Sequence, residues 1–166
     1  NLRNILDTND KEVIDAAHKM LLNEKALRKS LVMPFRFLTA YDQVTDPKTR
    51  RVLSKAIDLA VSNVPELGGR TLVAIDHSGS MWGRPQLIGD VMAAIALKKA
   101  DGDAMVFGTT AGYVEDYNVG KDVLTIARED IGNVMEHGSG TNMNEVFKNA
   151  RGEYNRVMIF TDQQSW

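Results

Sequence analysis

The sequence predicts an α/β domain with a mostly parallel sheet, preceded by an α-helical segment. Residues before position 64 show helical periodicity, a stretch with Pro and Gly follows at 63–70, and short apolar runs then alternate with helical stretches. Strands that alternate with helices are typical of parallel sheets whose two faces are both covered. We therefore expect an α-helical segment over residues 1–66 and an α/β domain over residues 67–166.

The composition excludes several classes of protein. The 166 residues are 43% hydrophobic and 25% charged, which favours a packed core over disorder. Residues 1–66 carry 11 Lys and Arg against 9 Asp and Glu, and residues 67–166 carry 9 against 13, so charge alone does not indicate a nucleic-acid-binding domain. The chain has no cysteine, which excludes disulfides and thiolate metal sites and is compatible with the cytoplasmic location that we expect.

The ends and the apolar runs of the chain give two further expectations. The longest apolar run, at 91–97, is too short to cross a bilayer, so we expect no membrane partner. The chain begins at Asn1 without an initiator Met or a signal-like segment, so we expect a fragment or a processed piece.

The helical segment contains three predicted stretches. Apolar spacing predicts a helix over 11–22, and helical character continues over 23–44, where Pro34 predicts a kink or a restart. Asp46 then offers an N-cap in front of Pro47 at the first helical position. The helix that follows has an apolar face made of Leu53, Ile57, Ala60 and Val64.

Six basic side chains of this segment have two interpretations: Arg28, Lys29, Arg36, Lys48, Arg51 and Lys55. The ordinary interpretation is a solvated outer surface of the helices. The other is a ridge that contacts RNA phosphates, for which affinity would fall steeply with salt. The sequence leaves both open.

The elements of the α/β domain follow from the pattern beyond residue 70. We expect Pro65, Gly68 and Gly69 to form the break between the two domains. Strands are predicted over 71–75, 104–107, 113–119 and 156–161, of which the third is the most polar. Helices are predicted over 85–99, 124–135 and 142–150.

Oxygen-bearing side chains follow two of the predicted strands. Asp76, Ser78 and Ser80 come after the first strand at alternate positions, so in an extended loop they point to the same side. Asp162 follows the last strand, and Thr141 lies in a glycine-containing loop before a helix. Ligands of open α/β sheets bind at the carboxyl ends of the strands. An all-oxygen set with two carboxylates suits Mg²⁺, or another divalent cation such as Mn²⁺ or Ca²⁺.

Each of these residues also has an ordinary explanation as a strand end, a turn residue or a helix cap. Asn142, for example, is a plausible N-cap with Glu145 three residues later. Catalysis fits less well, because DHSGS lacks the first glycine of a nucleophile elbow and no phosphate-binding loop is present. Strand alternation also points His77 away from Asp76 and Ser78, so we expect no enzyme.

Two sets of motifs resemble known families. DHSGS at 76–80, GT at 140–141 and TD at 161–162 resemble the metal-ion-dependent adhesion site of von Willebrand factor A domains. LRKSLVMPFRFLTAY followed by VPELGGRTLVAIDHSGSM resembles, more narrowly, the Ro/TROVE proteins, in which a ring of helical repeats ends beside such a domain. The resemblance implies that residues 1–64 are the last helices of the ring and that 67–166 begin the A domain.

The resemblance also implies roles for the site residues. Ser78, Ser80 and Thr141 would contact the metal directly or nearly so, and Asp76 and Asp162 would hold it partly through water. One coordination position would remain for an acidic group of a partner. We expect Met81 and Trp82 to form the lip against which that partner presses.

The function implied is a non-enzymatic, metal-dependent binding domain of a Ro-like RNA-binding protein. That family binds small structured Y RNAs and the ends of misfolded RNAs in ribonucleoproteins. The alternative is a protein-adhesive A domain without RNA binding. A domains usually have six strands in the order 3-2-1-4-5-6, so we expect a truncation after the fourth strand, with 156–161 as an exposed edge.

Overall fold

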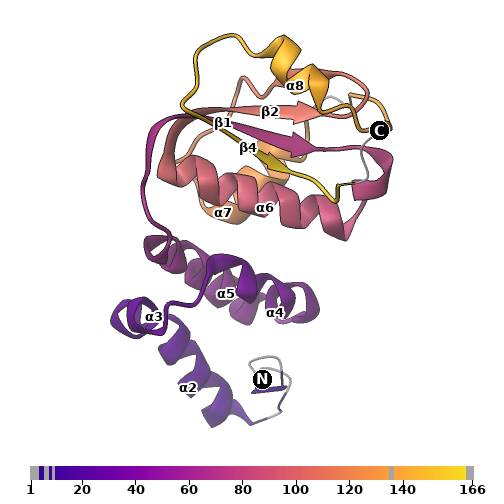
Figure 1. The fold of residues 1–166 in the computed structure, drawn as a ribbon. Coiled ribbons are helices and arrows are strands. Elements are labelled where there is room, and N and C mark those ends of the chain that lie inside the picture. The colour runs from indigo at the N-terminus through magenta and orange to yellow at the C-terminus, as the bar shows by residue number, and fades with distance from the viewer. Residues whose placement is uncertain (1–3, 6–7, 9, 135–136, 164–166) are drawn as a thin grey trace. The chain divides into compact units, whose positions relative to one another are not determined.

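The structure is a computed structural model that describes residues 4–5, 8, 10–134 and 137–163 (Figure 1). It divides into two compact units, Asn1–Pro65 and Glu66–Trp166. This division lies one residue before the boundary expected from the sequence. Over the described part of the chain, none of the helices has both the length and the apolar character needed to cross a membrane.

The first unit is helical throughout its described elements. These are α2 (Lys11–Leu21), α3 (Glu24–Ser30), η1 (Pro34–Phe37), α4 (Leu38–Gln43), α5 (Pro47–Ala60) and η2 (Val61–Asn63). The Asp10 side chain caps α2 by accepting from two backbone N–H groups, and Asp46 caps α5 by accepting from the N–H of Thr49. The helical character expected over 23–44 is divided among α3, η1 and α4. The division begins at Leu31, whose φ of 51° ends α3, and η1 then begins at Pro34.

The core of the helical unit is centred on α5. Leu53, Ala56 and Ile57 are fully buried. His18 of α2 is also buried, and its Nε2 lies 3.0 Å from the hydroxyl of Thr49 on α5. A polar contact thus joins α2 and α5 inside an apolar interface.

The second unit contains a four-stranded sheet in the order β3-β2-β1-β4. Its strands are β1 (Leu67–Asp76), β2 (Ala100–Phe107), β3 (Ala111–Tyr113) and β4 (Arg156–Phe160). Strand β1 pairs in parallel with β2 and with β4, and β3 pairs antiparallel to β2. The structure therefore confirms the predicted α/β fold with a mostly parallel sheet.

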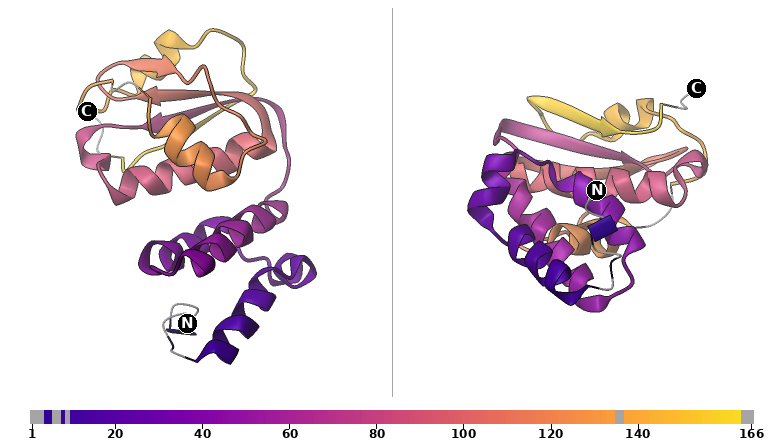
Figure 2. Two further views of the ribbon diagram at one scale, coloured as in Figure 1. Left: turned by 180° about the vertical axis from the view of Figure 1, so that it is seen from behind. Right: turned by 90° about the horizontal axis from the view of Figure 1, so that it is seen from below.

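Helices cover both faces of this sheet (Figures 1 and 2). On one face lie α6 (Arg84–Lys99), α7 (Val123–Thr125) and the π-helical turn Ile126–Ile131, and on the other lies α8 (Asn144–Asn149). Leu72 to Ile75 of β1 are completely buried, because side chains of both orientations meet a helical layer. The sheet therefore holds the carboxyl end of β1 in a fixed position.

The break expected at 63–70 is wrong in its second half. β1 already begins at Leu67, and the pairing with β2 shifts register between Leu67 and Arg70. Gly69 has a φ of +78° at this irregularity, and a Cβ there would lie 2.8 Å from the Asn155 side chain. The glycines therefore mark a β-bulge inside a strand, which sequence spacing does not distinguish from a loop.

Two other elements differ from the prediction. The strand expected over 113–119 is wrong beyond its first residue, because β3 ends at Tyr113 and the chain then turns out of the sheet. The hydroxyl of Tyr117 bonds to the carbonyl of Gly102, and the N–H of Asn118 bonds to Asp130. The helix expected over 124–135 is present but shorter: Val123–Thr125 is α-helical, a π-helical turn follows over Ile126–Ile131, and residues 132–134 form a turn. Residue 135 lies outside the described residues.

Candidate functional site

Asp76 is the last residue of β1 and its side chain is completely buried. Its Oδ1 accepts from the backbone N–H of Ser78 at 2.8 Å, and its Oδ2 accepts from the hydroxyl of Thr161 at 2.6 Å. The bond from Thr161 joins the ends of β1 and β4, which are adjacent parallel strands. A buried carboxylate therefore stands at the carboxyl edge of the sheet with one bond on each oxygen, and each oxygen keeps a further lone-pair site.

The two serines of the motif lie side by side. Ser78 is completely buried and Ser80 is exposed, and their hydroxyl oxygens are 3.2 Å apart. In an octahedron with metal–oxygen distances of about 2.1 Å, neighbouring ligand oxygens are about 3.0 Å apart. The spacing of the two hydroxyls thus fits adjacent coordination positions around Mg²⁺.

Backbone hydrogen bonds tie the loop that carries Thr141 to the serine loop and to Gly108, the residue after β2. The N–H of Gly79 donates to the carbonyl of Ser139 at 2.9 Å, and the N–H of Asn142 donates to the carbonyl of Gly108 at 2.8 Å. Thr141 itself is 3% exposed. A Cβ at Gly108 would lie 2.2 Å from the carbonyl oxygen of Gly138, so the close approach of these loops requires glycine.

Asp162 follows β4 and is half-buried. Together with Thr161, Met81 and neighbouring side chains it lines a hollow of about 360 Å³. The bond from Thr161 to Asp76 brings the residue next to Asp162 to the carboxylate of the motif. The structure therefore pairs Ser78 with Ser80, and places Thr141 and Asp162 on segments bonded to the same loop.

The five predicted metal ligands differ chemically from those of the usual transition-metal centre. In the described ranges, no group of three or more His, Cys, Asp or Glu side chains is arranged to hold a metal ion. The predicted set has two carboxylates and three hydroxyls, so it depends on hard oxygen donors rather than on such a cluster. Metal coordination by these five residues remains a prediction.

His77 is directed away from the serines, as the alternation predicts. Its Nε2 lies 2.7 Å from Oδ1 of Asp90 on α6, and the two side chains are 6% and 4% exposed. Burial raises the pKa of Asp90 more than the hydrogen bond and the charge of His77 lower it. The backbone N–H of His77 also donates to the carbonyl of Phe107 at the end of β2. This residue therefore fixes the start of the serine loop to both β2 and α6.

The two residues that we expect at the lip, Met81 and Trp82, differ in exposure. Trp82 is 80% exposed, but Met81 is 3% exposed and packs inward. Beside Trp82 lies a second hollow, of about 270 Å³, lined also by His77, Gly79, Gly138 and Ser139. The structure thus leaves a large apolar side chain exposed next to the serine loop.

All six basic residues singled out in the helical unit are exposed. They lie on α3, η1 and α5, and two of them form ion pairs, Arg28 with Glu24 and Lys48 with Asp15. On α5, Lys48, Arg51 and Lys55 share one face by their spacing. Contact with RNA phosphates by these residues remains a prediction.

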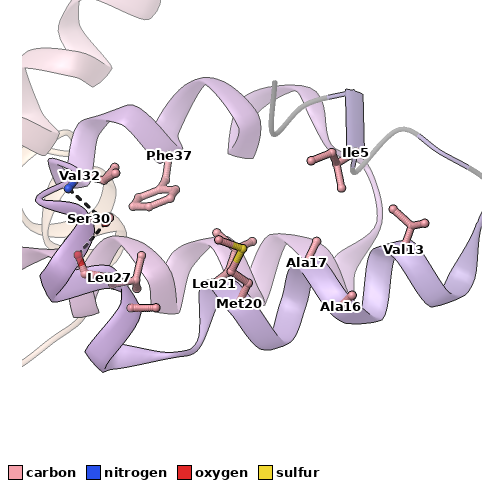
Figure 3. A pocket seen from close by; sticks show the side chains of 11 residues that line it. Ile5, Val13, Ala16, Ala17, Met20, Leu21, Leu27, Ser30, Val32 and Phe37 are labelled. Atoms are coloured by element: carbon pink, nitrogen blue, oxygen red, sulfur yellow. Dashed lines mark hydrogen bonds between the residues drawn. The ribbon is translucent and has the colours of Figure 1, made fainter.

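The helical unit also contains an apolar hollow of about 560 Å³ between α2, α3 and η1 (Figure 3). Val13, Ala17, Met20 and other apolar side chains line it. The polar side chain in its wall is Ser30, whose hydroxyl donates to the carbonyl of Leu27. This hollow offers little polar chemistry for orienting a small ligand.

Comparison with solved structures finds a likeness in fold. The fold resembles that of the Ro (RSR) protein of Deinococcus radiodurans. The TM-score is 0.76 at 22% sequence identity, and the match covers 100% of this chain and 39% of that protein. At this identity the likeness shows the fold alone. Protein-family models and curated proteins give no match to the sequence.

Sequence reasoning missed two residues of the site. Thr161 bonds directly to Asp76, and the signal for it was its position before Asp162 at a strand end. Asp90 holds His77, and its signal was a carboxylate between the buried Gly89 and Val91 of α6. A buried acid on a helix face needs a partner, but sequence alone does not name that partner.

Proposed function

We propose that the second unit is a non-enzymatic, divalent-metal-dependent binding domain with a von Willebrand A-type adhesion site. The observation that carries the proposal is the buried carboxylate of Asp76 beside the paired hydroxyls of Ser78 and Ser80. Such a constellation at the carboxyl edge of a parallel sheet suits a hard cation. It also leaves the exposed Ser80 side open to a partner.

The metal would be Mg²⁺ or another hard divalent cation. Asp76, Ser78, Ser80, Thr141 and Asp162 would hold it, and a bound ion would supply positive charge and a coordination position for a carboxylate of a partner protein. Asp76 is held in place by Thr161 and by the Ser78 N–H, and Ser78 by the fixed serine loop. These residues are positioned without a large rearrangement, which favours binding.

A catalytic role has less support. The hydroxyls of Ser78 and Ser80 bond to each other, whereas a nucleophilic serine needs a base within reach. The described histidine rings bond elsewhere: His18 to Thr49, His77 to Asp90 and His137 to Thr110. Burial, and to a smaller extent the charge of His77, lower the pKa of His137. We therefore propose binding rather than turnover.

We further propose that the chain is part of a Ro-like, cytoplasmic RNA-binding protein. Support comes from the motifs of both units and from the fold shared with the Deinococcus Ro protein. RNA, either Y RNA-like or misfolded, would bind through the wider protein, with the six basic residues of the helical unit contributing phosphate contacts. The alternative is an adhesive A domain that binds protein without RNA.

The metal proposal is tested by thermal unfolding in Mg²⁺ and in EDTA. A ligand that binds only the folded state at 100 times its Kd stabilises it by about 2.7 kcal/mol. We expect Mg²⁺ to raise the Tm of the wild type but not that of Asp76→Asn or Ser80→Ala. Asp116→Asn, an exposed carboxylate outside the motif, is the control and should keep the rise. An equal rise in the wild type and in Asp76→Asn contradicts the proposal.

A pull-down from cell extract distinguishes the Ro-like RNA-binding function from the alternative, an adhesive A domain that binds protein without RNA. Capture of a protein that EDTA abolishes, with no RNA in the eluate, favours the adhesive function. RNA in the eluate that persists in EDTA and disappears at high salt favours the Ro-like function, because phosphate contacts weaken with salt.

A further inference from the structure

We infer that the hollow beside Trp82 is a subsite for an apolar side chain of a protein partner, next to the acidic residue that the metal site takes. The inference rests on the proposed metal-dependent function and adds to it the chemical class of the partner. The segment recognised would carry Asp or Glu with an aromatic or aliphatic neighbour. Trp82 would be the main apolar contact.

The shape of the hollow supports a fixed subsite. Its volume is about 270 Å³, and it is lined by His77, Gly79, Trp82, Gly138 and Ser139. The bond from the Gly79 N–H to the Ser139 carbonyl ties its two sides together, and the buried pair with Asp90 holds the His77 ring. These contacts exist before any partner arrives, so little ordering is needed on binding.

Trp82 is the exposed apolar group of this region. It is 80% exposed, which leaves the large apolar surface of the indole unburied. Tryptophan is among the residues most enriched at the energetic centre of protein interfaces. An exposed indole at the rim of a hollow therefore indicates a binding surface more than a packing defect.

The subsite adjoins the metal site along the chain. Gly79 lies between the two serines, and Trp82 follows Ser80 by two residues. Consecutive residues of a partner are about 3.8 Å apart at their Cα atoms. A partner whose carboxylate reaches the serines therefore places a neighbouring side chain at the indole.

Charge favours a single carboxylate over a polyanion at this edge. Residues 67–166 have an excess of acidic groups, 13 against 9 Lys and Arg. Cations of this unit contact carboxylates, carbonyls or a hydroxyl within it, among them Arg70, Lys98, Lys99, Lys121, Lys148, Arg151 and Arg156. A unit with net negative charge attracts a nucleic-acid backbone less than a basic unit does, whereas one acidic residue in an apolar peptide carries a single charge.

The test uses two peptides on the whole chain, acetyl-Gly-Asp-Gly-amide and acetyl-Phe-Asp-Phe-amide. The chain has two tryptophans, so Trp166→Phe leaves the fluorescence of Trp82 as the reporter. In Mg²⁺ we expect the Phe peptide to bind about tenfold more tightly, to shift the Trp82 emission and to lose binding in EDTA. Calorimetry on Trp82→Ala should show equal affinities for the two peptides, with the Mg²⁺-dependent rise in Tm unchanged.

The outcomes separate this inference from the proposed function. If Mg²⁺ binds but the wild type does not distinguish the two peptides, the subsite is overturned and the metal site stands. If Mg²⁺ does not bind at all, both fall. A third arm adds an eight-residue oligouridylate, and displacement of the Phe peptide by it would assign the surface to single-stranded RNA and overturn the inference.

Discussion

The Nε2 of His77 lies 2.7 Å from Oδ1 of Asp90, and both side chains are almost completely buried. The pair joins the residue directly after β1 to the middle of α6. Since Asp76 and Ser78 flank His77 in the chain, the pair determines where the serine loop leaves the sheet. Its removal should therefore affect both stability and metal affinity.

The first prediction concerns this pair. Asp90→Ala leaves the ring of His77 buried without its partner, which costs about 3 kcal/mol. The double variant with His77→Ala should lose less than the sum of the single losses, because each change removes the same bond. Both tryptophans belong to the second unit, so tryptophan fluorescence in urea reports its unfolding. Additive losses would show that the contact contributes nothing.

A second prediction concerns the loop that carries Thr141. Gly138 has a φ of +85°, and a Cβ there would lie 2.7 Å from the hydroxyl oxygen of Thr109. Gly138→Ala should cost about 1–2 kcal/mol through backbone strain and should weaken Mg²⁺ binding by moving the loop. Gly68→Ala is the matched control, because nothing lies within 4 Å of its added Cβ. Unchanged Mg²⁺ affinity in Gly138→Ala would argue against coordination by Thr141.

Asp130 gives a prediction on pH. Its side chain is 6% exposed and lies 2.5 Å from Nζ of Lys121, and it accepts from the N–H of Asn118. Burial raises the pKa of Asp130, but the hydrogen bonds from Lys121 and Asn118 and the charge of Lys121 together lower it below 3.8. The folded carboxylate is thus favoured, so its stabilisation is complete well above pH 4 and is lost as the pH falls through the folded pKa.

We therefore expect Asp130→Asn to be less stable than the wild type by about 1 kcal/mol at pH 7, a figure reduced for the partial exposure of Lys121. The difference should stay constant down to about pH 5 and shrink below pH 4. Urea unfolding of both proteins between pH 3 and 7 measures it. If the difference in unfolding free energy between the two proteins grew on acidification, the prediction would be contradicted.

A fourth prediction addresses the helical unit. Thr49 is 3% exposed, and its hydroxyl donates to Asp46 and lies 3.0 Å from Nε2 of His18. Among the described residues, the buried Nδ1 of His18 has no hydrogen-bond partner. Thr49→Val keeps the shape but leaves both ring nitrogens unpaired, which costs about 2 kcal/mol. Hydrogen exchange of α2 and α5 should become faster. Thr45→Val, at an exposed position, should leave the exchange rates unchanged.

A fifth prediction tests RNA contact by the helical unit. If Arg51 and Lys55 neutralise phosphates, replacing both by Ala should weaken retention of a small structured RNA and reduce the slope of log K against log salt by about 1 for each contact. Lys148→Ala, on α8 and paired with Glu145, is the control. Retention that does not depend on salt would exclude phosphate contact.

The sequence predicted the carboxyl-terminal halves of β1 and β2 well, because Leu72–Ile75 and Ala104–Phe107 are continuous apolar runs that are buried on both faces. It also predicted β4 to within one residue, as 156–161 against the observed Arg156–Phe160, since the strand contains a continuous apolar run. It failed at Gly68 and Gly69, where a bulge and a loop have the same composition. It failed also beyond Tyr113, where long-range bonds to Gly102 and Asp130 override local strand character.

The residues of the candidate site could be predicted from the sequence, but the hydrogen bonds that hold them in place could not. The expected proximity of Ser78 and Ser80 agrees with the 3.2 Å separation of their hydroxyls, but a turn of 3₁₀ helix at Gly79–Met81, and not an extended loop, brings them together. The bonds that hold the loops come from Ser139 and Thr161, far along the chain, and no local pattern encodes such pairings. Met81 was placed on the rim because it neighbours Trp82, but a turn of 3₁₀ helix directs it inward.

The bond between Thr161 and Asp76 spans 85 residues of chain. Because β4 adds to β1 rather than to its sequence neighbour β3, this edge forms only after a long loop closes. During synthesis, Asp76 and the serines leave the ribosome well before Thr161 does. Capture of a ligand at this edge would then have to wait for this loop closure, and a nascent chain would remain unable to bind until β4 has docked.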